Sequence, residues 1–347
     1  MNMDTKILKV TTDKIDEDKL KEASHYINKG ELVVFPTETV YGLGADGLNA
    51  DACKKIFAAK NRPSDNPLIL HISHIDELDR LVGEVPEDAK LLAKNLWPGP
   101  LTMIFKKSKL IPDVVTAGGD TVAIRMPKDP IARKFIEICK TPLAAPSANI
   151  SGRPSPTNAQ DVYFDMNGRV SVIIDGGDCQ IGIESTVLDL TEDKPMILRP
   201  GFYTYEYIKG FLPNLVLDDS LVDDNVIPKS PGQKYKHYAP KAQMKIYVGD
   251  SSASYIYKEA KEEEKKGKKV GILAFEQDID KFYDFDFVSL GNKDNLIEMS
   301  HVLFSALRLL DKKDVDIILA QGVEDKNLGK SIMNRMKKSA SGNVIYL

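Results

Sequence analysis

The stretch ELVVFPTETVYGLGADGLNADACKKIFAAK, residues 31–60, indicates the class of fold. Its first part, ELVVFP (31–36), is an apolar run that ends at a proline, which predicts a short strand. Residues 49–60 carry apolar side chains at Ala52, Ile56 and Ala59, a spacing typical of a helix. A second apolar run, PLILHIS at 67–73, predicts the next strand. Strands and helices that alternate in this way are typical of an α/β protein.

The same alternation continues to about residue 210. Further strands are predicted at LTMIFKK, TVAIRMP, SVIIDGG, STVLDLT and PMILRPG, and helices at 18–30 and 87–97. Several neighbouring strands are joined too tightly for crossover helices, so we expect a twisted sheet of mixed direction with flanking helices.

The composition changes after this region. Residues 212–242 are rich in proline and aspartate and show weak periodicity, which is typical of a linker. From Met244 onward, strands are predicted at MKIYVGD, KKVGILAF and VDIILAQGV, with helices at 252–266, 293–311 and 327–340. Strands joined by long helical crossovers indicate a smaller, Rossmann-like domain with a parallel sheet. We therefore expect a first domain at 1–211, a linker at 212–242 and a second α/β domain at 243–347.

Composition excludes some classes of protein. The 347 residues carry a net charge of −4, so no global basic field is available to hold a large nucleic acid. The three cysteines, Cys53, Cys139 and Cys179, are far apart and form no metal motif, so we expect them to be buried and reduced, as in a cytosolic protein. The N-terminus lacks a signal-peptide core, and no apolar run reaches the roughly 20 residues that cross a bilayer.

Gly42, Gly44 and Gly47 match G-x-G-x-x-G, the spacing of a dinucleotide-binding turn. In that motif the first glycine directly follows the strand, whereas here PTETVY intervenes, and no acidic residue closes a second strand at the expected distance. The alternative is that the glycines supply positive φ in a loop packed against the sheet. The stretch GVEDKNLGKS (322–331) fails as a phosphate loop, because six residues rather than four separate its glycines.

Six polar clusters lie at strand ends and turns of the first domain. Together they supply cations, hydroxyls and amides, but no Ser-His-Asp order, cysteine nucleophile or metal-ligand spacing is evident. This combination suits phosphoryl or nucleotidyl transfer, which depends mainly on positioning and on neutralising charge. The clusters are at 36–39, 60–67, 121–125, 145–155, 184–186 and 199–201.

The order of these motifs resembles the YrdC-like family of threonylcarbamoyl-AMP synthases. The resemblance rests on FPTETVYGLGADG, KNRPSDNPLILHI, WPGPLT, VAIRMP, APSANISGRPSPT and GIESTVLDL. SPGQKYKHYAP, followed by a second α/β domain, is similar to the two-domain branch of that family. The resemblance implies a YrdC-like catalytic domain and a nucleotidyltransferase, L-threonylcarbamoyladenylate synthase, which condenses L-threonine, bicarbonate and ATP. It also implies that the product serves threonylcarbamoylation of the adenosine next to the anticodon in tRNA.

The resemblance further implies roles for individual residues. Lys60 and Arg62 would be catalytic. Threonine binding would involve Thr39, His71, Arg125, Ala145 and Ser185, with Ala145 acting through its backbone. ATP binding would involve Arg62, Asn66, Thr121, Ser147, Ser155, Arg199 and Tyr238. Bicarbonate would be held by Lys60, Arg62, Ser147 and Asn149.

The cofactor and partners follow from the same resemblance. Mg²⁺ would arrive with ATP, without a dedicated protein site, and a separate tRNA-modifying transferase complex would take the product. The enzyme would be cytoplasmic, with no membrane association. Residues 230–240 would cover the nucleotide as a lid that carries Tyr238. Two alternatives stay open: an RNA-binding module acting directly on tRNA or double-stranded RNA, and a carbamoyl-phosphate-using transferase, whose added zinc-finger and acylphosphatase-like segments are absent from this sequence.

Overall fold

The computed structural model describes residues 4–221 and 237–347. Two compact units form. The C-terminal unit comprises Tyr235–Leu347 together with two short earlier segments, Gly152–Ser155 and Ile181–Ile183, and the first unit comprises the rest of the chain. Each unit has its own sheet and is described by itself.

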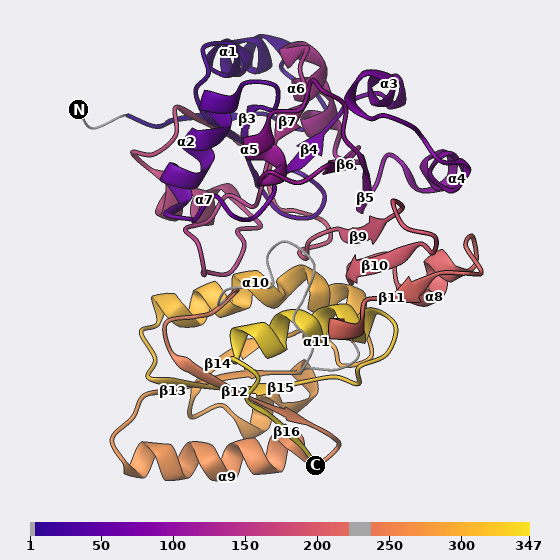
Figure 1. Ribbon diagram of the computed structural model, residues 1–347. Helices are drawn as coiled ribbons and strands as arrows, with labels where there is room; N and C mark the ends of the chain where they lie inside the picture. The colour runs from indigo at the N-terminus through magenta and orange to yellow at the C-terminus, as the bar shows by residue number, and fades with distance from the viewer. Residues whose placement is uncertain (1–3, 222–236) are drawn as a thin grey trace. The chain divides into compact units, whose positions relative to one another are not determined.

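The first unit is built on an eleven-stranded sheet of mixed direction, as the sequence predicts (Figure 1). The spatial order is β1-β8-β2-β3-β7-β4-β6-β5-β9-β10-β11. Its strands are β1 (Lys6–Lys9), β2 (Val33–Phe35), β3 (Gly42–Asp46), β4 (Ile69–His71), β5 (Leu101–Lys106), β6 (Thr121–Arg125), β7 (Leu143–Ala144), β8 (Val172–Asp175), β9 (Thr186–Asp189), β10 (Met196–Arg199) and β11 (Val216–Leu217).

Helices cover both faces of this sheet. Alternate residues of β2 point to opposite faces, so Val33 and Phe35 join one hydrophobic cluster and Val34 joins the other. The first cluster includes residues of α1 (Glu17–Asn28) and α6 (Pro130–Cys139). The second includes residues of α2 (Ala50–Lys60), α3 (Leu78–Leu81), α4 (Glu87–Leu96), α5 (Asp113–Thr116), α7 (Ala159–Met166) and α8 (Tyr205–Lys209). Short 3₁₀ turns occur at Ile75–Glu77 and Asp219–Leu221.

The glycines at 42–47 serve close packing, and the expectation of a positive-φ loop is wrong for them. Gly42 and Gly44 lie within β3, and none of the three has a positive φ. A Cβ added at Gly44 would lie 2.9 Å from the ring of Phe35, and one at Gly47 would lie 2.7 Å from the carbonyl oxygen of Pro142. Only a residue without a side chain lets β3 approach its neighbours this closely.

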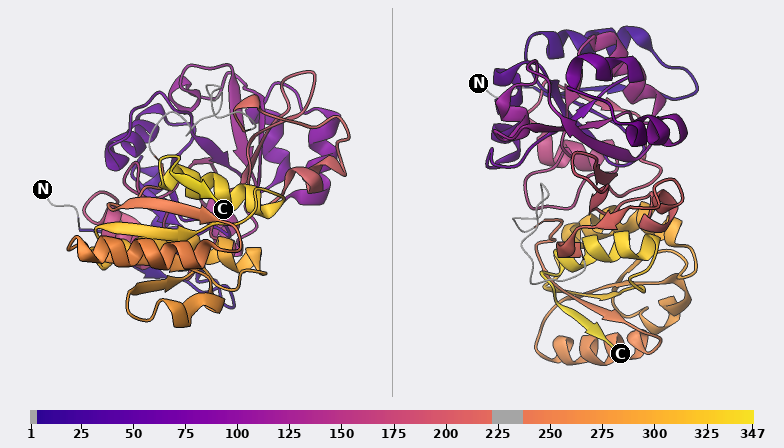
Figure 2. Two further views of the ribbon diagram at one scale, coloured as in Figure 1. Left: turned by 90° about the horizontal axis from the view of Figure 1, so that it is seen from below. Right: turned by 45° about the vertical axis from the view of Figure 1, so that its right-hand side comes forward.

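The C-terminal unit contains a parallel sheet, which confirms the prediction of a Rossmann-like domain. Its order is β14-β13-β15-β12-β16, and every pairing is parallel. Figures 1 and 2 show α9 on one face of this sheet and α10 and α11 on the other. The elements are β12 (Gln243–Val248), α9 (Ser252–Lys265), β13 (Val270–Ala274), the 3₁₀ turn Glu276–Lys281, β14 (Asp286–Ser289), α10 (Leu296–Lys312), β15 (Ile317–Gln321), α11 (Leu328–Ser339) and β16 (Val344–Tyr346).

The structure also bears on three sequence expectations, which concern the cysteines, membrane-spanning helices and the lid. All three cysteines are free and buried, as predicted. Within residues 4–221 and 237–347, no helix is both long and apolar enough to span a membrane. Most of the expected lid, residues 230–236, lies outside the described residues.

Candidate functional site

Strand direction brings several predicted site residues to one edge of the first sheet. His71 and Arg125 end the parallel strands β4 and β6 and lie side by side. β5 runs antiparallel to β6, so Thr102, near its beginning, lies opposite Arg125. Ser185 directly precedes β9, which is parallel to β5, and Arg199 ends the antiparallel neighbour β10. Residues distant in sequence therefore meet where three strands end and two begin.

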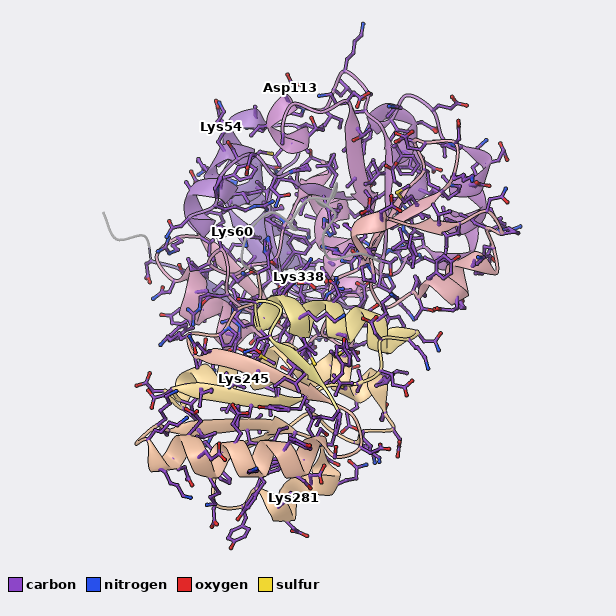
Figure 3. All side chains as sticks on the ribbon, turned by 60° about the horizontal axis from the view of Figure 1, so that its bottom comes forward. Lys54, Lys60, Asp113, Lys245, Lys281 and Lys338 are labelled. Atoms are coloured by element: carbon purple, nitrogen blue, oxygen red, sulfur yellow. The ribbon has the colours of Figure 1, made fainter. Side chains whose placement is uncertain are left out.

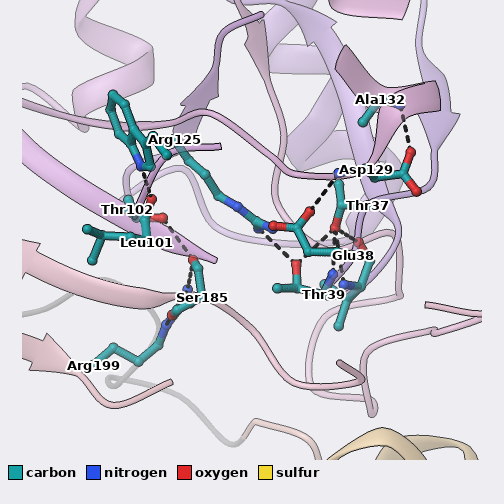
Figure 4. Close-up of polar contacts among 12 residues, drawn as sticks. Thr37, Glu38, Thr39, Leu101, Thr102, Arg125, Asp129, Ala132, Ser185 and Arg199 are labelled. Carbon is teal, nitrogen blue, oxygen red and sulfur yellow. Dashed lines mark hydrogen bonds and ion pairs between the residues drawn. The ribbon is translucent and has the colours of Figure 1, made fainter. Parts of the chain in front are cut away.

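The guanidinium of Arg125 is buried and held from the loop between β2 and β3 (Figure 4). Its Nη2 lies 2.7 Å from Oε1 of Glu38, and both side chains are at most 5% exposed. Its Nη1 donates to Oγ1 of Thr39 over 2.8 Å. The Nε has no hydrogen-bond partner among the described residues. Arg125 is thus fixed by Glu38 and Thr39, and its Nε is a buried donor that the described residues leave unused.

Ser185 is held by two neighbours. Its Oγ lies 2.8 Å from Oγ1 of Thr102, which is completely buried, and accepts from Nη2 of Arg199 over 3.1 Å. Arg199 also donates from Nε and Nη2 to the carbonyl oxygen of Ser185. Arg199 therefore orders the start of β9 in addition to bringing positive charge to this edge.

His71 is uncharged at neutral pH. Burial, with a smaller contribution from the neighbouring charge of Arg125, lowers the pKa of His71 to about 3. Its Nδ1 lies 3.3 Å from the carbonyl oxygen of Ile69, and its ring packs edge-on against Phe35. His71 can therefore offer shape and a hydrogen bond, but no charge, to a ligand.

Ala145 follows β7, which runs antiparallel to β4, so Ala145 lies beside Ile69 at the start of β4. Its backbone N–H donates to the carbonyl oxygen of Ile69 over 2.9 Å. A ligand contact through the backbone of Ala145 is therefore left to its carbonyl oxygen.

Lys60 forms a second cluster with Ser147 and Asn149. It is the last residue of α2 and is 3% exposed. Its Nζ donates to the carbonyl oxygens of Ser147, over 2.5 Å, and of Asn149, over 2.7 Å. Ser147 Oγ donates to Oδ1 of Asn149 over 2.5 Å. The buried ammonium thus fixes the turn that carries Ser147 and Asn149.

Backbone hydrogen bonds connect this turn to the loop that holds Arg125. The N–H of Ala148 donates to the carbonyl oxygen of Tyr41, and the N–H of Leu43 donates to that of Pro146, both over 2.8 Å. Thr39 lies just before this connection in sequence. The cluster of Lys60 and the cluster of Arg125 therefore share one supporting loop.

Arg62, Asn66 and Thr121 lie apart from Arg125. Arg62 donates from Nη2 to the carbonyl oxygen of Asn66 over 3.0 Å, and its guanidinium lies over the ring of Phe57. Thr121 begins β6, about 13 Å from Arg125 at the usual rise of a strand. Because β4 and β6 are parallel in register, the residues that follow Asn66 run beside Thr121. The predicted nucleotide residues of the first unit therefore do not all gather around Arg125.

Two further predicted nucleotide residues belong to the C-terminal unit. Ser155 is completely buried. Tyr238 has a positive φ of 59°, packs its ring 5.1 Å from that of Phe304, and accepts a hydrogen bond from Ser339 at its carbonyl oxygen.

Sequence reasoning missed three residues of this region. Glu38 lies inside the motif FPTETVYGLGADG but was given no role. The sequence does mark it, because a carboxylate between two threonines at the end of an apolar strand is unusual. Thr102 had no signal of its own, because a single threonine in an apolar strand is common. Asp129 caps α6 by accepting from the N–H of Ala132, and its own N–H donates to Oε2 of Glu38 over 3.4 Å.

Two family models together match nearly the whole chain. Residues 25–201 match the Sua5/YciO/YrdC model, which is described as telomere recombination. Residues 203–341 match a model described as the C-terminal domain of threonylcarbamoyl-AMP synthase.

Named relatives are similar over their full length. A threonylcarbamoyl-AMP synthase of Pyrococcus abyssi is 47% identical, with 96% of this chain and 97% of the relative covered. One of Bacillus subtilis is 46% identical, with 95% of each chain covered. The crystal structure of P. abyssi Sua5 complexed with L-threonine superposes with a TM-score of 0.93 at 46% identity, with 99% of this chain and all of that chain covered.

Proposed function

Because this chain belongs to the family of threonylcarbamoyl-AMP synthases, a family of nucleotidyltransferases, we propose that it condenses L-threonine, bicarbonate and ATP into threonylcarbamoyl-AMP and pyrophosphate. The observation that carries this proposal is the shared sheet edge, where Arg125, Arg199, Thr39 and Ser185 combine two cations with two hydroxyls. Such an edge suits an amino acid that brings a carboxylate and an amine.

The reaction proceeds in two balanced steps. The deprotonated amine of threonine attacks the carbon of bicarbonate, giving a carbamate and releasing water. A carbamate oxygen then attacks the α-phosphorus of ATP in line, and pyrophosphate leaves. Positioning and neutralisation of charge supply most of the catalysis in such transfers.

The roles of the residues follow their positions. Arg125 brings positive charge to the carboxylate of threonine. Lys60 orders the turn of Ser147 and Asn149, so that this turn can receive bicarbonate and phosphate oxygens. Arg62 and Asn66 contact the phosphates of ATP from the loop that follows α2. Arg62 stabilises the negative charge that develops on the phosphates as pyrophosphate leaves.

Mg²⁺ would accompany the triphosphate and neutralise part of its charge. In the part of the chain that the structure describes, no three histidine, cysteine, aspartate or glutamate side chains gather as metal ligands. No step above depends on a protein ligand to the ion.

The product is an activated carbamoyl group, which a tRNA-modifying transferase would transfer to the adenosine next to the anticodon. The three free, buried cysteines suit the reducing cytoplasm, where tRNA is modified. Direct contact with tRNA would be weak, because the net charge of the chain is −4.

The test measures pyrophosphate released from ATP, with threonine and bicarbonate each omitted in turn. We expect release only when all three substrates are present, together with a product whose mass equals that of threonylcarbamoyl-AMP. Release that does not depend on threonine would contradict the proposal. Salt-sensitive tRNA binding without consumption of ATP would instead favour an RNA-binding module.

A further inference from the structure

One face of α10 contacts three segments that come from other parts of the chain. Two of them, Gly152–Ser155 and Ile181–Ile183, belong with α10 to the C-terminal unit, and the third is formed by residues 238–241 of the same unit. Ser300 Oγ, for example, donates to the carbonyl oxygen of Ile181 over 3.0 Å. Residues spaced by three or four along a helix point the same way. The residues of this face are Ser300, Phe304, Arg308 and Asp311, and each is at most 7% exposed.

Arg308 holds the segment Gly152–Ser155. Its Nε and Nη2 both donate to the carbonyl oxygen of Pro154, over 3.0 Å and 2.5 Å. The side chain is buried, and a buried charge is costly unless its donors are used in this way. The chain leaves the first unit after Ser151 and returns to it at Pro156. Arg308 therefore fixes a short segment near its middle, directly before Ser155, which is a predicted ATP residue.

Asp311 joins two of the segments. Its Oδ1 accepts from the backbone N–H of Lys241 over 2.8 Å, and its Oδ2 lies 3.9 Å from Nη2 of Arg153. The N–H of Ala239 donates to the carbonyl oxygen of Gly152 over 2.8 Å. The segments Gly152–Ser155 and 238–241 are thus fixed to each other as well as to α10.

Tyr238, the other predicted ATP residue of this unit, is held on both sides of its backbone. Its φ of 59° is a conformation that residues other than glycine adopt rarely, and it persists only where the surroundings fix it. Its carbonyl oxygen accepts from Ser339 Oγ of α11 over 2.8 Å, and its ring packs against Phe304 of α10. The next residue, Ala239, carries the hydrogen bond to Gly152.

The polar character of this helix face needs a reason beyond packing. Well-packed apolar residues are often as stabilising as buried charged ones, so a face that only joined segments could be apolar. Arg308 and Asp311 instead bind particular backbone atoms of the two segments that carry Ser155 and Tyr238. Backbone positions have to be fixed in this way where a segment meets a ligand.

We propose that Arg308 and Asp311 are positioning residues for ATP, which hold Gly152–Ser155 and residues 238–241 in the conformation that binds the nucleotide. This inference rests on the proposed function, in which Ser155 and Tyr238 bind ATP. It gives the C-terminal unit a role in the reaction, because α10 then sets the affinity for ATP through the two segments.

The experiment measures nucleotide affinity in full-length variants. Arg308→Met keeps a long stem but removes both donors to Pro154. Calorimetry gives the Kd for ATP, and pyrophosphate release gives KM and kcat. We expect the Kd and KM for ATP to rise about tenfold, with kcat within about twofold, because a displaced binding group weakens binding of the substrate and of the transition state alike.

A pair of variants at position 311 tests the second residue. Asp311→Leu removes the acceptor of the Lys241 N–H and should raise the Kd for ATP in the same way. Asp311→Asn keeps an oxygen at this place and should restore the affinity. If Arg308→Met does not fold, this pair decides the question.

Two measurements separate positioning from a general loss of structure. The Kd for L-threonine, measured without ATP, should stay within about twofold of the wild type in every variant, because Thr39, Arg125 and Ser185 belong to the first unit. Ser305→Ala is the matched control on α10, since Ser305 Oγ donates to the carbonyl oxygen of Val302 in its own helix. It should leave the Kd for ATP unchanged.

Three results would overturn the inference. They are an unchanged Kd for ATP in Arg308→Met and Asp311→Leu, an equal loss of affinity for threonine, and an Asp311→Asn variant no better than Asp311→Leu. A wild-type protein that releases no pyrophosphate in response to threonine would instead contradict the proposed function. The two failures are therefore distinguishable.

Discussion

Lys60 is a buried cation whose ammonium contacts the turn formed by residues 147–149. Its Nζ donates to the carbonyl oxygens of Ser147 and Asn149 and approaches Oδ1 of Asn149 at 3.4 Å. A buried ammonium is costly unless its hydrogens are used in this way. The ammonium of Lys60 thus fixes the shape of the turn that carries Ser147 and Asn149.

Replacing this ammonium should abolish most of the activity. In Lys60→Met the stem is kept, while two buried carbonyl oxygens lose their donor, and we expect turnover to fall about 100-fold or more. Lys54→Met is the matched control, because Lys54 lies on the same helix, is 65% exposed and pairs only with Asp51 among the described residues (Figure 3). Turnover in Lys60→Met that equals that of the control would contradict the assignment.

Asp129 makes the stability of the fold depend on pH. Burial raises the pKa of Asp129 to about 6, from an ordinary value of 3.8, and the nearby charge of Glu38 contributes in the same direction. Between these pH values the folded chain keeps a proton that the unfolded chain releases. The contribution of Asp129 to the free energy of unfolding is therefore fully present below about pH 4 and is lost as pH rises to about 6.

Asp129→Asn should remove this dependence, since an amide oxygen can still accept from the N–H of Ala132. We expect the variant to exceed the wild type in stability by on the order of 2 kcal/mol at pH 7, with little difference at pH 4. Urea unfolding at both pH values measures this. His71, with its pKa lowered to about 3, changes stability in the opposite direction, but it is common to both proteins and cancels in the difference. A difference that is the same at both pH values would refute the role of Asp129.

The pairing of β2 and β3 depends on a glycine. A Cβ at Gly44 would lie 2.9 Å from the Phe35 ring and 3.0 Å from the carbonyl oxygen of Val33, which is its partner residue in the register. We expect Gly44→Ala to lower the free energy of unfolding by about 1–3 kcal/mol, measured by urea denaturation. Gly83→Ala is the control, because its added Cβ would have its nearest contact at 3.9 Å. Equal stabilities of the two variants would show that the strands can separate without cost.

These elements show how far sequence reasoning extends. The helix at 49–60 and the strand at 67–73 were predictable, because their apolar periodicity is local. The glycines of 42–47 were misread in detail, because the ring that crowds them, Phe35, belongs to another strand. The helix α6 was not predicted, although Pro130 at its start and Asp129 before it are ordinary signals of a helix N-terminus.

The site was predictable only as a set of motifs. The positions of Arg125 and Ser185 followed from the resemblance, but their contact partners depend on strand order. Thr102 is brought opposite Arg125 by an antiparallel pairing that no local pattern in the sequence specifies. The hydrogen bond between Thr102 and Ser185 likewise joins two residues that lie far apart in the sequence.

At the scale of the whole molecule, binding of a ligand should raise the free energy of unfolding. A ligand that binds only the folded state stabilises it by about 2.7 kcal/mol at one hundred times its Kd. For a unit of about 150–250 residues this raises the melting temperature by about 5–10 °C. L-threonine at that concentration should therefore raise the melting temperature measured by calorimetry.

The handedness of the ligand makes this test specific. Arg125, Ser185 and Thr39 present a guanidinium and two hydroxyls from fixed positions on different strands and loops. D-threonine has the same groups in mirror-image order, so it cannot match all three at once, and we expect a shift of less than about 1 °C at the same concentration. Equal shifts with both enantiomers would mean that threonine stabilises the protein as a general cosolute, and the arrangement at the sheet edge would then not be its binding site.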